Sequence, residues 1–195
     1  MEFRRNLNFY WQLLCVILYR FYLIATKGVN LMNFFSKAAI VAKPGFNRWL
    51  VPPAALAVHL CIGQVYAYSV FNLPLARYFD VSVNKLYIFA VAIFLLGVSA
   101  AIAGAWLEKV GPRTTMFASA CCFGGGFLIS TLGVYLNFLP LIYFGYGVLG
   151  GIGLGLGYVS PVSTLIKWFP DRRGMATGMA IMGFGGGAMV GGPLG

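Results

Sequence analysis

The chain has 195 residues, of which 60% are hydrophobic and 9% are charged, and its formal net charge is +10. A soluble domain carries about 25% charged residues because its surface faces water, so the composition excludes an ordinary soluble globule. It predicts an integral membrane protein whose surroundings are the lipid bilayer. The basic residues lie in short clusters between long apolar runs, which is typical of cytoplasmic loops in membrane proteins and does not indicate a nucleic-acid partner.

Residues 1–48 form a first region, which we expect to be cytoplasmic or interfacial. Its apolar run at residues 13–24 contains Arg20, whose insertion cost of about 2.5–3.5 kcal/mol offsets the gain from the apolar side chains. Three interpretations stay open: an interfacial amphipathic helix, an uncleaved signal-like segment, or a native start at Met32. The first and the third are favoured.

Five apolar runs follow within residues 49–195, each about 20 to 27 residues long, and short polar breaks separate them. About 20 helical residues cross the core of a bilayer. Backbone groups in lipid must be satisfied within their own segment, and the period-2 alternation of membrane strands is absent from these runs, so they predict helices. The predicted fold is all-α, with spanning helices at residues 49–75, 86–107, 114–136, 141–166 and 174–195.

The charges between the runs predict the orientation. With the N-terminus in the cytoplasm, the cytoplasmic segments from residue 43 onward hold seven Lys or Arg residues and the outer loops hold two, which is the expected bias. We therefore expect a multi-pass protein of the plasma (inner or cell) membrane. The seven residues are Lys43, Arg48, Lys109, Arg113, Lys167, Arg172 and Arg173.

Glycines form a stripe on each of the last two runs, at intervals of four residues. Small residues at this spacing let helices approach closely in lipid. The stripes are either static packing faces or smooth faces along which helices slide during a transport cycle. They consist of Gly147, Gly151 and Gly155 in the fourth run and Gly183, Gly187 and Gly191 in the fifth.

The chemistry of an enzyme or a metal centre is not expected. One His and four acidic residues cannot supply a Ser–His–acid set together with a metal-ligand cluster, and no phosphate-binding loop occurs. The four cysteines lie inside apolar runs without the spacing of metal ligands. We therefore predict no catalytic residues, no cofactor and no metal.

The segment from Gly104 to Arg113 reads Gly-Ala-Trp-Leu-Glu-Lys-Val-Gly-Pro-Arg. It resembles the signature between helices two and three of the major facilitator superfamily, with Glu108 where aspartate is usual. In that family the acid and the arginine belong to a cytoplasmic charge network that biases the conformational equilibrium. The resemblance implies this switch role for Glu108 and Arg113, together with Lys109 and Gly111, whereas the alternative is a loop of solvated charges.

A second segment, from Lys167 to Gly174, reads Lys-Trp-Phe-Pro-Asp-Arg-Arg-Gly and includes Asp171, Arg172 and Arg173. It resembles the loop between helices four and five of oxalate/formate antiporters and their monocarboxylate-carrying relatives. The resemblance covers residues 47–195 and implies a partial N-terminal six-helix half of a major facilitator fold. It also implies a substrate site at the midplane, completed by a missing C-terminal half that carries the cationic residues for the anion.

Polar side chains in the first run are candidates for the substrate path, because polar groups at that depth face a cavity or a neighbouring helix. His59 and Tyr66 share one helical face. A second face carries Gln64, Tyr68 and Asn72, at intervals of four residues. The resemblance adds Tyr158, which matches a cavity-lining tyrosine of the oxalate/formate group.

The sequence thus predicts a secondary transporter that moves a small organic anion, such as oxalate, formate or a monocarboxylate, by alternating access, here as an incomplete chain. Two alternatives remain. One is a non-transporting membrane module or truncated product that acts through helix–helix association. The other is a sensor or receptor that keeps the transporter fold without flux.

Overall fold

The computed structural model describes residues 42 and 44–194, and all regular structure in this part of the chain is helical. Our predictions for residues 1–41, including the apolar run at residues 13–24, lie outside the described residues. Each of the five runs predicted from residue 49 onward forms a helical segment, which confirms the all-α fold. The helices are α3 (Val51–Gly63), α4 (Tyr68–Tyr78), α5 (Ile88–Val110), α6 (Pro112–Tyr135), α7 (Leu139–Ile142), α8 (Gly151–Trp168) and α9 (Arg173–Leu194).

Four segments of the described chain are long and apolar enough to cross a membrane, namely Arg48–Tyr78, Ile88–Val110, Pro112–Tyr135 and Leu139–Trp168. Helix α9 is not among them, because eight of its 22 residues are glycines, which lower its mean hydropathy. Its length of about 33 Å nevertheless exceeds the ~30 Å hydrocarbon core of a bilayer. The fifth predicted span is therefore a helix of spanning length but low hydropathy.

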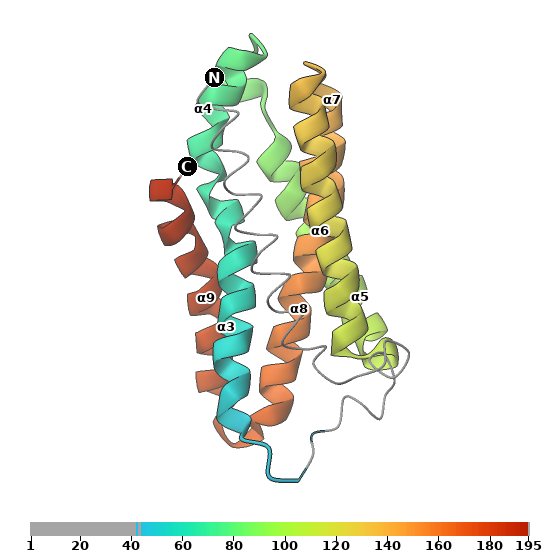
Figure 1. The fold of residues 1–195 in the computed structure, drawn as a ribbon, viewed down its shortest axis with the longest axis vertical. Coiled ribbons are helices and arrows are strands. Elements are labelled where there is room, and N and C mark those ends of the chain that lie inside the picture. The colour runs from blue at the N-terminus through green and yellow to red at the C-terminus, as the bar shows by residue number, and fades with distance from the viewer. Residues whose placement is uncertain (1–41, 43, 195) are drawn as a thin grey trace.

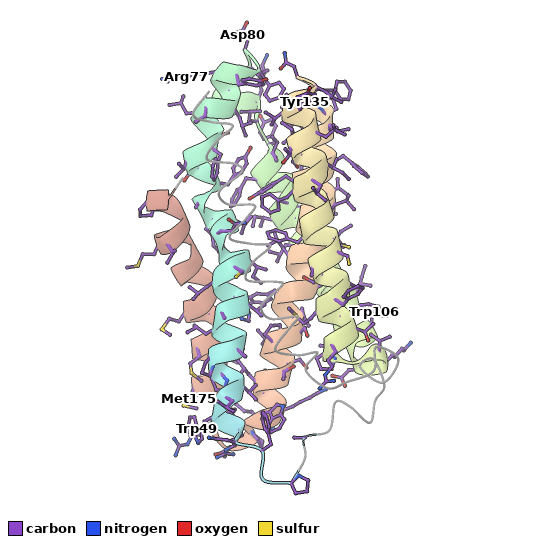
Figure 2. All side chains as sticks on the ribbon, viewed as in Figure 1. Trp49, Arg77, Asp80, Trp106, Tyr135 and Met175 are labelled. Carbon is purple, nitrogen blue, oxygen red and sulfur yellow. The ribbon has the colours of Figure 1, made fainter. Side chains whose placement is uncertain are left out.

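The helices lie side by side along the long axis of the molecule (Figure 1). Helix α8 packs against α3, α5 and α6, and α9 packs along α3. Asp80 marks one end of the bundle and Trp49 the other (Figure 2), and we call these the Asp80 end and the Trp49 end. Large apolar side chains such as Ile102 (68% exposed) and Met189 (83% exposed) face outward, as expected for a bundle that lies in lipid.

A single residue, Gly111, separates α5 from α6. Its φ of 87° lies in the left-handed region that favours glycine. Pro112 then occupies the first turn of α6, where its missing N–H costs no hydrogen bond. Helical structure extends beyond the predicted apolar runs, because Glu108 and Lys109 belong to the last turn of α5.

The first and fourth spans each contain a stretch that is not α-helical, which the sequence did not predict. Residues Gln64–Ala67 form a 3-10 turn between α3 and α4. Residues Tyr143–Gly150 form a π-helix between α7 and α8. Each stretch changes the number of residues per turn, so side chains before and after it do not keep one regular face.

Buried side chains form three clusters along the bundle. Ile88 belongs to the cluster nearest the Asp80 end. Leu154 and Phe184 belong to the middle cluster, in which α8 and α9 meet the first span. Leu165 and Phe169 are fully buried in the cluster at the Trp49 end. The partly buried ring of Tyr158 packs against the middle cluster.

Candidate functional site

His59 is a fully buried polar side chain in α3. Its Nδ1 lies 2.9 Å from the carbonyl oxygen of Ala55, one helical turn earlier. Because a carbonyl oxygen only accepts hydrogen bonds, Nδ1 carries the proton, and Nε2 of the neutral ring is left as an acceptor. Nε2 has no hydrogen-bond partner among the described residues. An unsatisfied buried polar group costs about 1–3 kcal/mol, so this nitrogen is a candidate for binding a proton or a ligand.

Aromatic rings from two other helices enclose His59. The ring centroid of Tyr158, in α8, lies 5.7 Å from that of His59, and the ring centroid of Phe184, in α9, lies 6.4 Å away. Tyr158 and Phe184 are 5.3 Å apart, and Tyr66 lies 5.0 Å from Phe184. The structure thus brings together three predicted site residues, His59, Tyr66 and Tyr158. Phe184 completes this cluster. The sequence did not predict Phe184 as a site residue, because it lies in an apolar, glycine-rich segment without a polar motif.

Tyr68 and Asn72 form a second polar group, nearer the Asp80 end. The buried ring of Tyr68 stacks on Phe89 of α5 at 6.0 Å and lies 5.3 Å from Tyr146. The Tyr68 hydroxyl and Oδ1 of Asn72 are buried and have no hydrogen-bond partner in the described part of the chain. These two atoms and Nε2 of His59 place three unsatisfied polar groups on the first span.

The predicted common face of Gln64, Tyr68 and Asn72 requires a continuous α-helix, and the 3-10 turn interrupts it. Gln64 instead lies against α9. A Cβ atom added to Gly191 of α9 would be 3.5 Å from the Cβ atom of Gln64. Tyr68 faces α5 and the π-helical stretch. The prediction of a single three-residue face is therefore wrong, whereas His59 and Tyr66 do meet at Phe184.

At the Trp49 end, Arg48 and Asp171 form a bidentate ion pair, with both N–O distances at 3.1 Å. The Arg48 guanidinium also lies over the ring of Phe169, 5.0 Å from its centroid. The hydrogen bond from Arg48 is the largest cause that holds the pKa of Asp171 below its usual range, and the charge of Arg172 adds to it. The pair joins the start of the first span to the turn between α8 and α9.

A second ion pair joins the two predicted charged motifs. Nζ of Lys167 lies 2.7 Å from Oε1 of Glu108, so the ends of α8 and α5 are bridged. Lys109 and Arg173 are exposed, and Arg113 lies in the first turn of α6. The resemblance implied a network built on Glu108 and Arg113, and the structure shows Lys167 as a partner of Glu108.

The two glycine stripes lie at helix contacts. A Cβ added to Gly151 would lie 2.7 Å from the carbonyl oxygen of Ala92, and one added to Gly187 would lie 2.5 Å from that of Leu60. The stripe in α8 and the preceding turn faces α5, and the stripe in α9 faces the first span. By contrast, a Cβ at Gly104 would have no atom within 4 Å among the described residues. The stripe residues concerned are Gly147, Gly151, Gly155, Gly183, Gly187 and Gly191.

Charged groups are confined to the ends of the described spans. Arg77 lies in the last turn of α4, Lys109 in that of α5, and Lys167 in that of α8. The described residues contain no group of three or more His, Cys, Asp and Glu side chains that could hold a metal ion. The polar groups inside the described bundle are therefore hydroxyl, amide and imidazole groups rather than carboxylates, ammonium or guanidinium groups.

Apolar helices of spanning length, with polar groups enclosed between them, define a polytopic membrane protein. Residues 54–195 match the family model described as Major Facilitator Superfamily, so the chain belongs to this superfamily of transporters. This confirms the resemblance found on the two charged motifs.

Curated relatives are 27–30% identical to this chain over the aligned residues. An uncharacterised MFS-type transporter of Escherichia coli, YhjX, is 30% identical over 144 residues, which are 73% of this chain and 35% of the relative. The oxalate:formate antiporter of Oxalobacter formigenes is 28% identical over 71% of this chain and 33% of its own length. Human monocarboxylate transporter 11 is 27% identical over 73% of this chain and 30% of its own length. The chain thus spans about a third of the length of these relatives.

Proposed function

We propose that this chain supplies the first five helices of a secondary transporter that moves a small organic anion by alternating access. Residues 49–195 would belong to the N-terminal half, and residues 1–48 would lie in the cytoplasm or at the membrane surface. A C-terminal half would complete the substrate site as the partner of this bundle. The substrate class is a small carboxylate such as oxalate, formate or a monocarboxylate.

The cluster at His59 carries the proposal. The ring of His59, whose Nε2 has no hydrogen-bond partner in the described structure, lies in an aromatic enclosure to which α8 and α9 contribute Tyr158 and Phe184. Neutral imidazole offers an acceptor to a protonated carboxyl group, and protonated imidazole offers a donor to a carboxylate. The Tyr158 hydroxyl adds a donor and the rings add apolar surface, which together suit a small carboxylate.

The names of the relatives support the substrate class, since two of them are an oxalate:formate antiporter and a monocarboxylate transporter. The charges support the orientation. The Trp49 end carries the ion pairs of Arg48 and Lys167 and the exposed Lys109. Positive segments resist translocation, so we assign this end to the cytoplasm of the plasma or inner membrane.

The decisive experiment is exchange by the full-length protein that contains this chain. Proteoliposomes would be loaded with unlabelled oxalate, formate or lactate, and uptake of the labelled anion would be measured. We expect uptake of at least one anion to be accelerated by a carboxylate inside the vesicle. A folded protein that shows no such acceleration with any of the three would overturn the proposed substrate class.

Two variants test the site. Tyr158→Phe removes one hydroxyl donor and is expected to reduce the apparent affinity for the anion about fivefold, since a hydrogen bond contributes about 1 kcal/mol. Tyr87→Phe is the matched control, because the Tyr87 side chain is 62% exposed and lies outside the aromatic cluster. If both variants bind and transport the anion like the unmodified protein, the Tyr158 hydroxyl does not donate to the anion.

A further inference from the structure

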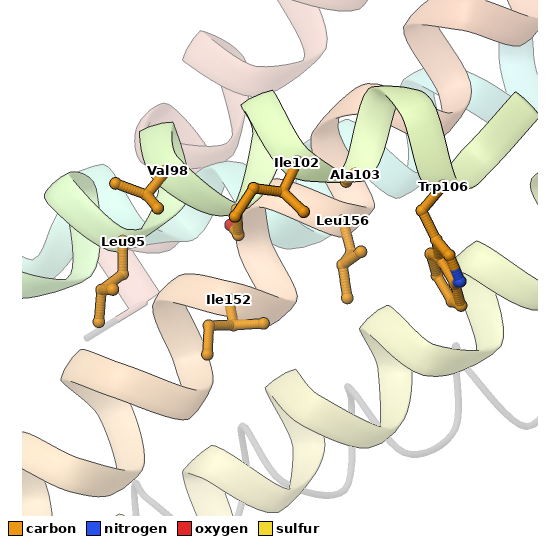
Figure 3. Close-up of a pocket in the computed structure, with 8 residues that line it drawn as sticks. Leu95, Val98, Ile102, Ala103, Trp106, Ile152 and Leu156 are labelled. Carbon is orange, nitrogen blue, oxygen red and sulfur yellow. The ribbon is translucent and has the colours of Figure 1, made fainter.

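An apolar groove of about 310 Å³ runs between α5 and α8 (Figure 3). The hydroxyl of Ser99, which also lines it, is engaged by the carbonyl oxygens of Leu96 at 3.1 Å and Gly151 at 3.5 Å, so the wall presents hydrocarbon. The side chains that shape the groove are Leu95, Val98, Ile102 and Trp106 of α5 and Ile152 and Leu156 of α8.

The groove lies on the side of α8 away from the proposed substrate path. Leu156 and Tyr158 are two residues apart in an α-helix, which directs their side chains about 200° apart. Tyr158 packs on His59, so Leu156 faces away from α3. Ile102 is 68% exposed and Val98 is 42% exposed along the rim. This position opens the groove to the lipid rather than to the substrate.

One face of α5 leads from the groove to Lys109, whose ammonium group has no acidic partner in the described part of the chain. Leu95, Val98, Ile102, Trp106 and Lys109 follow one another at intervals of three or four residues, so they form one stripe. From Leu95 to Trp106 the stripe rises about 16 Å, roughly the hydrocarbon depth of one leaflet. Trp106 then lies where aromatic side chains meet the headgroup region, and Lys109 lies one turn beyond it.

The charge of Lys109 is available to an external anion. Its neighbour in sequence, Glu108, is already paired with Lys167 at 2.7 Å. Lys109 is exposed and has no acidic partner among the described residues. A lysine at the membrane surface attracts anionic lipid headgroups by electrostatics.

We propose that the groove between α5 and α8 holds an acyl chain of an anionic phospholipid whose phosphate pairs with Lys109. The apolar groove binds the chain, Trp106 marks the level of the glycerol backbone, and Lys109 selects for negative charge. The site is independent of the transported substrate, because it lies on the opposite side of α8 from His59 and Tyr158.

The test uses the fluorescence of Trp106 in the full chain, after Trp11, Trp49 and Trp168 are replaced by Phe. The protein would be reconstituted in phosphatidylcholine vesicles that contain increasing fractions of brominated phosphatidylglycerol or, in parallel, brominated phosphatidylcholine. Bromine quenches tryptophan at contact, so the two titrations compare the lipids at the groove. We expect phosphatidylglycerol to be preferred about fivefold, the electrostatic contribution of one lysine near the surface.

Lys109→Gln should abolish this preference while quenching by both lipids persists. Lys85→Gln is the matched control, because Lys85 is exposed but follows the first span at the Asp80 end, and it should leave the preference intact. Leu156→Phe, which fills the groove, should weaken quenching by both lipids. Equal quenching by the two lipids, or a preference that survives Lys109→Gln, would overturn the proposal. Absence of quenching by either lipid would show that protein rather than lipid covers the groove, and would overturn it too.

Discussion

Glu108 and Lys167 meet at 2.7 Å although 59 positions separate them, and their contact joins the ends of two parallel spans, α5 and α8. Each side chain is 60% exposed. An exposed ion pair contributes about 0–1 kcal/mol, so its removal leaves the bundle folded. The pair is therefore suited to adjust the relative positions of the two helix ends rather than to hold the fold together.

We predict that Glu108→Gln lowers the free energy of unfolding by less than about 1 kcal/mol. A double-mutant cycle with Lys167→Gln, measured by denaturant unfolding in detergent, should show a coupling of the same small size. The coupling should shrink as salt is added, because exposed charges are screened. A coupling that is large or insensitive to salt would show that the pair is shielded from water.

The ion pair of Arg48 and Asp171 should make stability depend on pH in the acid range only. The folded-state pKa of Asp171 lies below its unfolded value of about 4, so the folded protein holds the proton less tightly. The pair's contribution is therefore fully present above pH ~4 and is lost as the pH falls through the lower folded pKa. The difference in unfolding midpoint between the unmodified chain and Asp171→Asn should be constant near neutrality and vanish in acid. A difference that already disappears at neutral pH would contradict this assignment.

The glycine stripe in α8 should not tolerate a methyl group. A Cβ at Gly151 would lie 2.7 Å from the carbonyl oxygen of Ala92 and 3.0 Å from Cβ of Leu95. We expect Gly151→Ala to cost about 1–3 kcal/mol through overpacking of α5 and α8. Gly97→Ala in α5 is the control, since no described atom lies within 4 Å of its added Cβ, and it should be neutral or slightly stabilising. Thermal unfolding of both variants in the same detergent checks the difference.

Gly111 should be required for its backbone conformation rather than for space. Its φ of 87° strains any residue that has a Cβ, and it is the single residue between α5 and α6. Gly111→Ala is expected to lower the free energy of unfolding by about 1–3 kcal/mol, because a φ of 87° with a ψ of 164° is a backbone region that glycine alone adopts readily. Gly111→Asn should cost a similar amount, since asparagine is favoured only in the left-handed helical region, at a ψ of about 30–60°. Denaturant unfolding of both variants checks this, and a neutral Gly111→Asn would contradict the conformational cause.

Hydropathy predicted the helices of this bundle well, because a spanning segment must satisfy its own backbone whatever its neighbours do. The end of α5 was placed at residue 107 and lies at Val110, and the end of α8 was placed at residue 166 and lies at Trp168. The turns at Gln64–Ala67 and Tyr143–Gly150 escaped prediction, since a window of apolar residues contains no information on residues per turn.

Contacts between distant segments were harder to predict. The enclosure of His59 requires Phe184, which lies 125 positions later in the chain. The ion-pair partner of Asp171 is Arg48, which lies 123 positions earlier in the chain. The sequence predicts both residues at the cytoplasmic surface but does not predict that they pair. Helical spacing predicts neighbours within one helix, whereas these pairs depend on how separate helices pack.

The π-helical stretch Tyr143–Gly150 has a consequence at the level of the gene. A π turn holds more residues than an α turn, so this span contains more residues, and its gene more codons, than an α-helix of the same length. Loss of one codon there would let the stretch become α-helical, so that one residue fewer turns through nearly the same angle and the flanking helices keep their phase. Tyr158 would then still face His59, and the reading frame and the hydropathy of the span would scarcely change. Alignments of this span therefore need to allow a single-residue gap at Tyr143–Gly150 before they compare the aromatic positions on either side.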